Sequence, residues 1–140
     1  MKAKEFLERA DKAKAIITAR LAEIERYNEM AQSITVVLDN IKVTSTHTIQ
    51  DRMAEAAVMA LDASERLLDD IAYYNDVVKE INNTIEQLPV LYYQVLHGVH
   101  IQGKYLIEIA DDLDKSYSAI TTANGRALKE LDRLLESRKN

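Results

Sequence analysis

The chain has 140 residues, which is enough for one compact domain or for a small domain joined to an extended helical element. It has only three glycines and one proline, and its apolar residues are mostly Ala, Leu, Ile and Val, so the composition predicts an almost all-α protein and excludes a sheet protein with many tight turns. The lack of cysteine excludes disulfides and cysteine nucleophiles, and the net charge of −5 argues against a strong polyanion binder.

The N-terminal sequence MKAKEFLERADKAK is charged throughout and lacks the apolar core of a signal peptide. No apolar run approaches the ~20 residues that span a bilayer. We therefore expect a soluble cytoplasmic protein with no membrane partner. Residues 1–50 carry 8 basic and 7 acidic side chains, residues 51–87 carry 3 and 9, and residues 88–140 carry 7 and 7, so the acidic charge is concentrated in the middle of the chain.

The first long segment has apolar residues at alternating intervals of three and four, as in a coiled-coil seam. These residues are Ala10, Ala13, Ile17, Leu21, Ile24, Tyr27, Ala31, Ile34 and Leu38. The spacing predicts a helix from about Lys4 to the mid-30s. The β-branched and polar residues from Asp39 to Thr48 predict a linker, and the spacing of Thr48 and Asp51 is typical of a helix start at Thr48.

The second long segment has a seam of the same period. Its members are Met53, Ala57, Ala60, Ser64, Leu67, Ile71, Tyr74, Val78, Ile81, Ile85 and Leu88. Pro89 closes this helix, because proline pushes the preceding residue out of helical geometry. We expect residues 1–88 to form a long, coiled-coil-like antiparallel hairpin for oligomerisation or docking, and a homodimer would cover the apolar surface that one hairpin leaves exposed.

The remaining residues, 89–140, predict three shorter helices, with the sequences VLYYQVLHG, YLIEIADDL and SYSAITTANGRALKELDRLLES. Between the last two, Asp114 and Lys115 form a tight turn and Ser116 is a typical N-cap. The spacing directs one set of side chains into the domain: Ile109, Ala110, Leu113, Ile120, Ala123, Ala127 and Leu128. It leaves Tyr117, Ser118, Thr121, Thr122 and Gly125 facing outward. This is the layout of a helix-turn-helix whose second helix enters the major groove.

These residues resemble region 4 of bacterial sigma factors. More closely, they resemble phage sigma-like late transcriptional regulators of the RinA and ArpU type, which have a long helical pair, then LP, an apolar helix, Gly-Lys, E-I-A-x-x-L, Ser, and a helix ending in R-A-L. The resemblance implies a DNA-binding domain in residues 89–140. It also implies activation of phage or prophage late genes in the bacterial cytoplasm, with double-stranded DNA and RNA polymerase as partners.

Carried over by position, the resemblance gives DNA-facing roles to Tyr117, Ser118, Thr121 and Thr122, with Gly125 on the same face. It makes Ser116 the cap and places Arg126 near a phosphate. Two features depart from the family. Tyr105 stands where such motifs cap the first helix with Ser or Thr, and the central positions lack the Arg or Gln that would make bidentate contacts with bases. Sequence readout is therefore expected to be weak or to need a partner.

Other chemistry is poorly supported by the sequence. His97 and His100 have no third ligand nearby, so no metal site is expected. The pairs Asp69-Asp70 and Asp111-Asp112 lie on amphipathic segments as solvated faces, so we expect no catalytic residues, no cofactor and no enzyme activity. Two alternatives to a regulator stay open: a DNA-packaging adaptor like a small terminase subunit, and a helical protein-interaction module without DNA binding.

Overall fold

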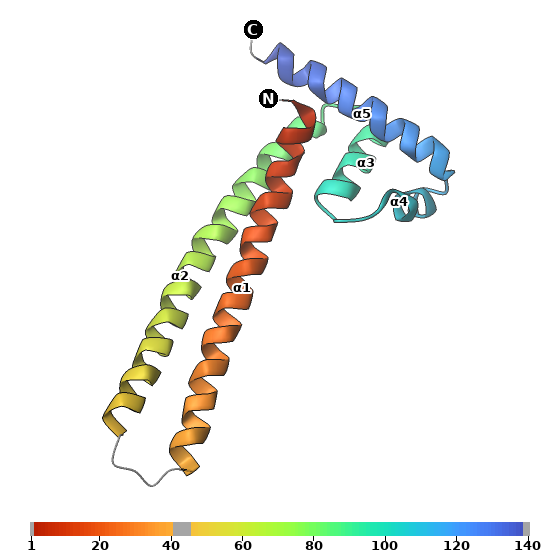
Figure 1. Ribbon diagram of the computed structural model, residues 1–140. Coiled ribbons are helices and arrows are strands. Elements are labelled where there is room, and N and C mark those ends of the chain that lie inside the picture. The colour runs from red at the N-terminus through yellow and green to blue at the C-terminus, as the bar shows by residue number, and fades with distance from the viewer. Residues whose placement is uncertain (1, 41–45, 139–140) are drawn as a thin grey trace. The chain divides into compact units, whose positions relative to one another are not determined.

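The computed structural model describes the backbone of residues 2–40 and 46–138, and the side chains of residues 2–32 and 50–138. Throughout these residues the regular elements are α-helices, which confirms the predicted all-α fold (Figure 1). The helices are α1 (Ala3–Asn40), α2 (Thr46–Ile85), α3 (Val90–His100), α4 (Leu106–Asp112) and α5 (Tyr117–Ser137). The bounds of α3, α4 and α5 agree closely with the three short helices that the sequence predicts.

The two long helices end at other residues than predicted. α1 is helical through Asn40 instead of stopping in the mid-30s, and α2 begins at Thr46, so Thr48 lies inside the helix and is not its N-cap. Residues 41–45 of the predicted linker lie outside the described residues. α2 stops at Ile85, before the turn in which the Leu88 N–H donates to the Ile85 carbonyl at 3.0 Å. The predicted bounds give too much weight to low helix propensity, because a few tenths of a kcal/mol per residue do not end a long helix.

The chain divides into two compact units. Unit 1 comprises Met1–Lys14 and Tyr74–Asn140, and unit 2 comprises Ala15–Tyr73. α1 and α2 contribute residues to both units, whereas α3, α4 and α5 belong to unit 1. The domain boundary expected between residues 88 and 89 does not coincide with a boundary between the units. The reason is that the first turns of α1 and the last turns of α2 share a core with α3 and α5.

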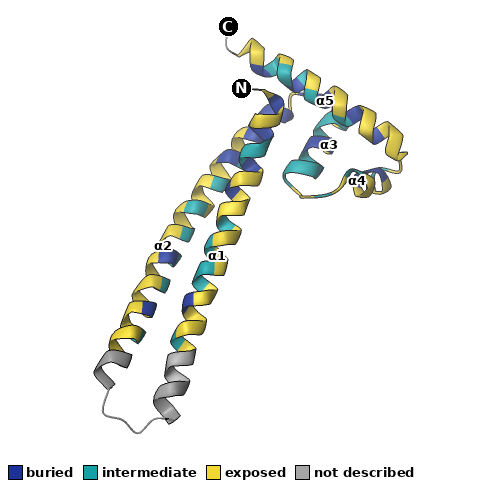
Figure 2. Cartoon of the chain, in the orientation of Figure 1, coloured by how far each residue is buried: buried dark blue, intermediate teal, exposed yellow. Residues whose placement is uncertain are grey.

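The larger core of unit 1 is built from long apolar side chains of α1, α2, α3 and α5. Leu7, Ile81, Leu96 and Leu131 are each fully buried in it, and Figure 2 shows the buried residues gathering at these parts of the helices. Burying one such side chain contributes roughly 1.5–3 kcal/mol to folding. This core therefore accounts for much of the stability of unit 1.

Polar contacts lie at the edges of the same core. The guanidinium of Arg9 lies 3.0 Å from the carboxylate of Glu80. Thr84 is the one fully buried polar residue of the described part of the chain, and its hydroxyl is satisfied twice. It donates to the Glu80 carbonyl at 2.8 Å and accepts from the Arg138 guanidinium at 3.0 Å. A buried hydroxyl with both roles filled avoids the free-energy cost of an unpaired polar group.

A second, smaller core lies between α3, α4 and α5. It consists of Val95, Ile109, Ala110, Ile120 and Ala123. Gly98 allows α3 and α4 to approach closely, since a Cβ atom there would lie 2.8 Å from Cδ1 of Ile109. The inward positions predicted for α4 and α5 are confirmed, with Leu113 and Leu128 only partly buried.

In unit 2, α1 and α2 pack through a strict heptad seam. Its members are Ile17, Arg20, Ile24 and Tyr27 of α1 and Met53, Ala56, Ala60, Ala63, Leu67 and Asp70 of α2, all buried or half-buried. Arg20 pairs with Asp70, whereas Met30 lines the same hollow as Ala56. Later residues of α1 therefore meet earlier residues of α2, so the two helices are antiparallel within this unit.

Three residues predicted for the seam are exposed: Leu21, Ala57 and Ile71. The observed heptad positions are instead occupied by Arg20 and Asp70, whose Nε and Oδ2 atoms lie 3.0 Å apart. The hydrogen bond to Asp70 raises the pKa of Arg20 above its usual value, against the opposing effect of burial. Mutual pairing lets two charged residues occupy seam positions that the sequence pattern gives to apolar neighbours. Ile34 and Leu38 of the predicted seam lie outside the described side chains.

Candidate nucleic-acid interface

The turn between α4 and α5 is held by its own backbone. Asp114 has a positive φ of 54°, a conformation that Asp tolerates better than most residues. The Lys115 N–H donates to the Ala110 carbonyl at 2.9 Å, and the Asp114 N–H donates to the Asp111 carbonyl at 3.2 Å. This pair of hydrogen bonds around a left-handed residue is a Schellman motif, which ends α4 sharply. The tight turn predicted at Asp114 and Lys115 is confirmed.

The start of α5 is capped by a side chain. Ser116 has extended backbone angles, and its Oγ accepts from the Ala119 N–H at 3.1 Å, as predicted. α4 lacks such a cap, because Tyr105 stands at its N-cap without a side-chain hydrogen bond. The start of α5 therefore has a local restraint that the start of α4 does not have.

The residues predicted to face DNA are all exposed. They are Ser116, Tyr117, Ser118, Thr121, Thr122, Gly125 and Arg126. Apart from its chain neighbours and the backbone of its own helix, Gly125 has no atom within 4 Å of the position where a Cβ would lie, so this side of α5 is open. The outward orientation of these residues is thus confirmed, whereas their contact with DNA stays a prediction.

The exposed residues do not form one continuous hollow. Ser116, Ser118, Thr122 and Arg126 line a shallow groove together with Ala119 and Ala123 of α5 and with Leu91 and Tyr92 of α3. Tyr117 instead lines a separate hollow between α4 and α5. The predicted set is therefore divided, with hydroxyls and the guanidinium on one side and an aromatic ring on the other.

Thr121 presents its methyl group more readily than its hydroxyl. Its Oγ1 donates to the Tyr117 carbonyl one turn earlier, at 2.8 Å. A hydroxyl used in this way has no proton left to donate to a base or a phosphate, although its lone pairs stay free to accept. Thr121 is therefore suited to contact with an apolar group such as the thymine methyl.

Positive charge around this face is sparse. The ammonium of Lys104 lies 2.7 Å from the carboxylate of Asp112, which partly neutralises it. Arg133, farther along α5, pairs with Glu130 at 2.7 Å. Within the described residues no ion pair is present at Lys115, Arg126 or Lys129, and all three are exposed, so these three cations are available to phosphates. The local field is weak, as the sequence predicts.

One surface feature beside this face was not predicted from the sequence. Tyr105, Ile107 and Tyr117 expose 75%, 65% and 56% of their surface and line an apolar hollow with Val99, Leu106 and the stem of Lys104. The signal was present in the sequence, because Ile107 precedes the buried Ile109 by two residues and must point to the other side of a helix.

Three of the other candidate residues lie close to charged side chains. The Nδ1 atom of His100 lies 3.5 Å from Oδ2 of Asp11, and Asp70 and Asp112 are both paired with cations. Over the described ranges, no group of three His, Cys, Asp or Glu side chains is placed to hold a metal ion. None of the described helices is both long enough and apolar enough to cross a membrane.

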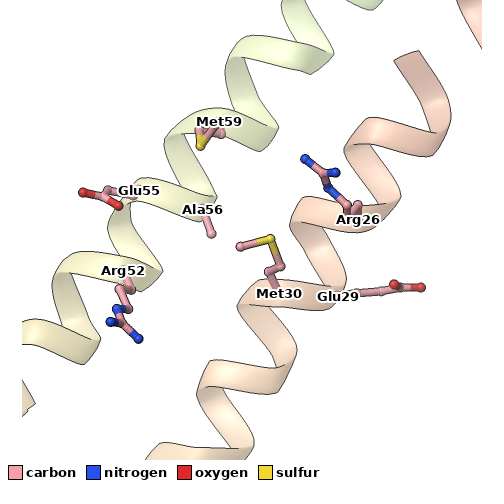
Figure 3. Close-up of a pocket in the computed structure, with 7 residues that line it drawn as sticks. All are labelled: Arg26, Glu29, Met30, Arg52, Glu55, Ala56 and Met59. Carbon is pink, nitrogen blue, oxygen red and sulfur yellow. The ribbon is translucent and has the colours of Figure 1, made fainter. Parts of the chain in front are cut away.

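Unit 2 has a hollow of its own, between α1 and α2 (Figure 3). Ala56 leaves space in the seam there, and the side chain of Met30 points toward it from α1. The remaining lining residues are Arg26, Glu29, Arg52, Glu55 and Met59. Figure 3 shows the carboxylates of Glu29 and Glu55 pointing away from the space between the two helices.

Comparisons with protein-family models, with curated protein sequences and with solved structures found no match.

Proposed function

We propose that this protein is a DNA-binding transcriptional regulator, in which the start of α5 docks in the major groove of double-stranded DNA. The observation that carries the proposal is the arrangement at the α4–α5 turn. A left-handed turn residue, an N-cap at Ser116 and an open face from Tyr117 to Arg126 occur together. A helix presented by its N-terminus brings free amide groups and a partial positive charge toward a phosphate.

The mode of binding follows from the chemistry of the face. Thr121 and Thr122 contact base edges, with the Thr121 methyl group against thymine, while Arg126 and Lys115 pair with phosphates. Three unpaired cations provide a weak nonspecific attraction, so affinity depends on a second contact. In keeping with the family resemblance, that contact is RNA polymerase at phage or prophage late promoters.

Fluorescence polarisation with duplex fragments of the neighbouring genome, across a salt series, tests the proposal. Because each neutralised phosphate adds about 0.9 to the slope of log affinity against log salt, Arg126→Ala should lower that slope by about 1. Arg133→Ala is the matched control, since Arg133 lies on the same helix but pairs with Glu130, and it should leave the slope unchanged. If no fragment binds in a salt-dependent way, the proposal is wrong.

Base reading is tested separately. Thr121→Ser keeps the hydroxyl that bonds Tyr117 and removes only the methyl group. It should reduce the preference for the best fragment by less than the roughly 1–3 kcal/mol of a bidentate base contact, while nonspecific affinity stays constant. Thr18→Ser, which removes the same methyl group from the exposed surface of α1, is the control. Equal losses on specific and nonspecific fragments would contradict base reading by Thr121.

A protein-interaction role without DNA binding is the second candidate, and one observation favours it. Tyr105, Ile107 and Tyr117 form an exposed apolar hollow at the same end of α4 and α5, where a DNA-binding surface is usually basic. Failure of DNA binding at low salt, together with an intact helical spectrum, would support this candidate instead.

A further inference from the structure

The second helix has two apolar stripes, and α1 covers only one of them. The covered stripe is the seam of unit 2. The other runs along the neighbouring face of α2 and consists of Ala54, Ala57, Leu61, Ser64, Leu68 and Ile71, a set that we name the outer stripe. Leu61 and Leu68 expose 63% and 67% of their surface, and Figure 2 shows how much of α2 is exposed along this part.

The outer stripe has the spacing of a helix-packing surface. Its residues recur at intervals of three, four, three, four and three, so it is a second heptad seam on the same helix. None of its members is acidic: Glu55, Asp62 and Asp69 form a ridge of their own seven residues apart, and Glu65 lies beside the stripe. A stripe without charge on its members needs an equally uncharged, heptad-spaced partner.

The one polar member of the outer stripe is ready for burial. The hydroxyl of Ser64 donates to the Ala60 carbonyl of its own helix at 2.8 Å. Its donor is therefore satisfied without water or a partner, and covering it would leave no unpaired proton.

We propose that the outer stripe packs against the outer stripe of a second copy of this chain, with the two α2 helices antiparallel. The pattern of side-chain size carries the choice of occupant. If a two-fold axis passes between residues 62 and 63, Ala54 faces Ile71 of the second copy, Ala57 faces Leu68 and Ser64 faces Leu61. Every layer then joins a small side chain to a large one, which fills the interface evenly without overpacking.

Charge agrees with this register. The residues that flank the outer stripe are Val58, Glu65 and Ala72 on one side, and Ala60 and Leu67 on the other. In the antiparallel register Glu65 faces Val58 of the second copy, so the two Glu65 carboxylates do not face each other. The interface is self-complementary in side-chain size, as a two-fold interface must be. This association does not depend on DNA binding.

Sedimentation equilibrium of the full chain from about 1 µM to about 1 mM, the range in which small interfaces dissociate, tests the proposal. The wild-type chain should approach twice the mass of one chain. The double variant with Leu61→Asp and Leu68→Asp should stay monomeric, because dimerisation would bury two carboxylates of each chain. Its helical spectrum should be unchanged. Ile16→Asp, an exposed apolar position of α1, is the matched control and should still dimerise. A wild-type chain that is monomeric throughout, or a double variant that still dimerises, would overturn the proposal.

Single cysteines test the register, because the chain has none of its own. Under mild oxidation a mixture of Ala57→Cys and Leu68→Cys chains should form a disulfide between copies. Neither variant should do so alone, since identical residues would lie about 16 Å apart along the helix axis and a disulfide needs Cα atoms within about 7 Å. Crosslinking of either variant alone as fast as the mixture would show a parallel pairing and overturn the register.

Discussion

Units 1 and 2 contain different parts of the same two helices, and they bury those parts to different degrees. In unit 1, Leu7 of α1 and Ile81 and Ile85 of α2 are fully buried. In the described side chains of unit 2, the buried residues are Tyr27, Ala56 and Ala63, and several large apolar side chains stay exposed. The heptad continues through both parts, so the difference does not come from the spacing of apolar residues.

The difference comes from what covers the helices. A pair of helices can bury only the stripe along which they meet, whereas α3 and α5 cover further faces of α1 and α2 in unit 1. The seam of unit 2 is one residue-wide stripe on each helix, and it combines alanines, a few larger apolar side chains and one charged pair. A sequence that places Leu61 and Leu68 outside that seam has apolar surface that the single chain does not bury.

The largest expected effect comes from truncating the same helix in each unit. Ile81→Ala in unit 1 should lower the free energy of unfolding by about 2–5 kcal/mol, because it opens a cavity in a closed core. Leu68→Ala in unit 2 should change it by less than about 0.5 kcal/mol at low protein concentration, because Leu68 is exposed. Urea unfolding followed by circular dichroism measures both. Similar losses for the two variants would remove the contrast between the units.

A smaller effect is expected at the start of α5, where order rests on a surface hydrogen bond. Ser116→Ala removes the acceptor of the Ala119 N–H and should destabilise the protein by about 1 kcal/mol. The same substitution should speed up hydrogen exchange at the Ala119 N–H. Ser118→Ala is the control, since Ser118 is exposed and is not the cap. If both variants behave alike, the cap does not hold this helix and the burial of Ile120 alone does.

The sequence predicts unit 1 better than unit 2, and the reason is physical. In α4 and α5 the signals agree: Ser116 caps, Asp114 turns, and Ile120 and Ala123 repeat on one face. Each signal is local, and each feature lies where the sequence places it. Contact with DNA is not local in this sense, because it depends on a molecule outside the chain.

In α2 the apolar residues are so dense that two neighbouring heptad-spaced sets of residues fit the sequence. The set through Ala57 and Ile71 has the more apolar members, yet the observed seam contains Ala56 and Asp70. Only the long-range partner Arg20 makes Asp70 acceptable there, and a pairing between residues fifty positions apart leaves no local mark. The same ambiguity conceals the outer stripe, because the sequence pattern assigns several of its members to the seam.

The smallest expected effect comes from the charged layer that distinguishes the seam of unit 2. Asp70→Leu should lower the thermal midpoint slightly, because it leaves the half-buried Arg20 guanidinium with only Glu23 at 3.1 Å. Arg20→Leu with Asp70→Leu should raise the midpoint above wild type, because an apolar layer replaces a pair that must be desolvated. We expect small effects, because Glu23 still pairs with Arg20 in the single variant and an apolar layer replaces both charges in the double variant. If the double variant unfolds at a lower temperature than the wild type, this ion pair is a net stabiliser of unit 2. Unit 2 would then differ from unit 1 in more than the number of helices that cover it.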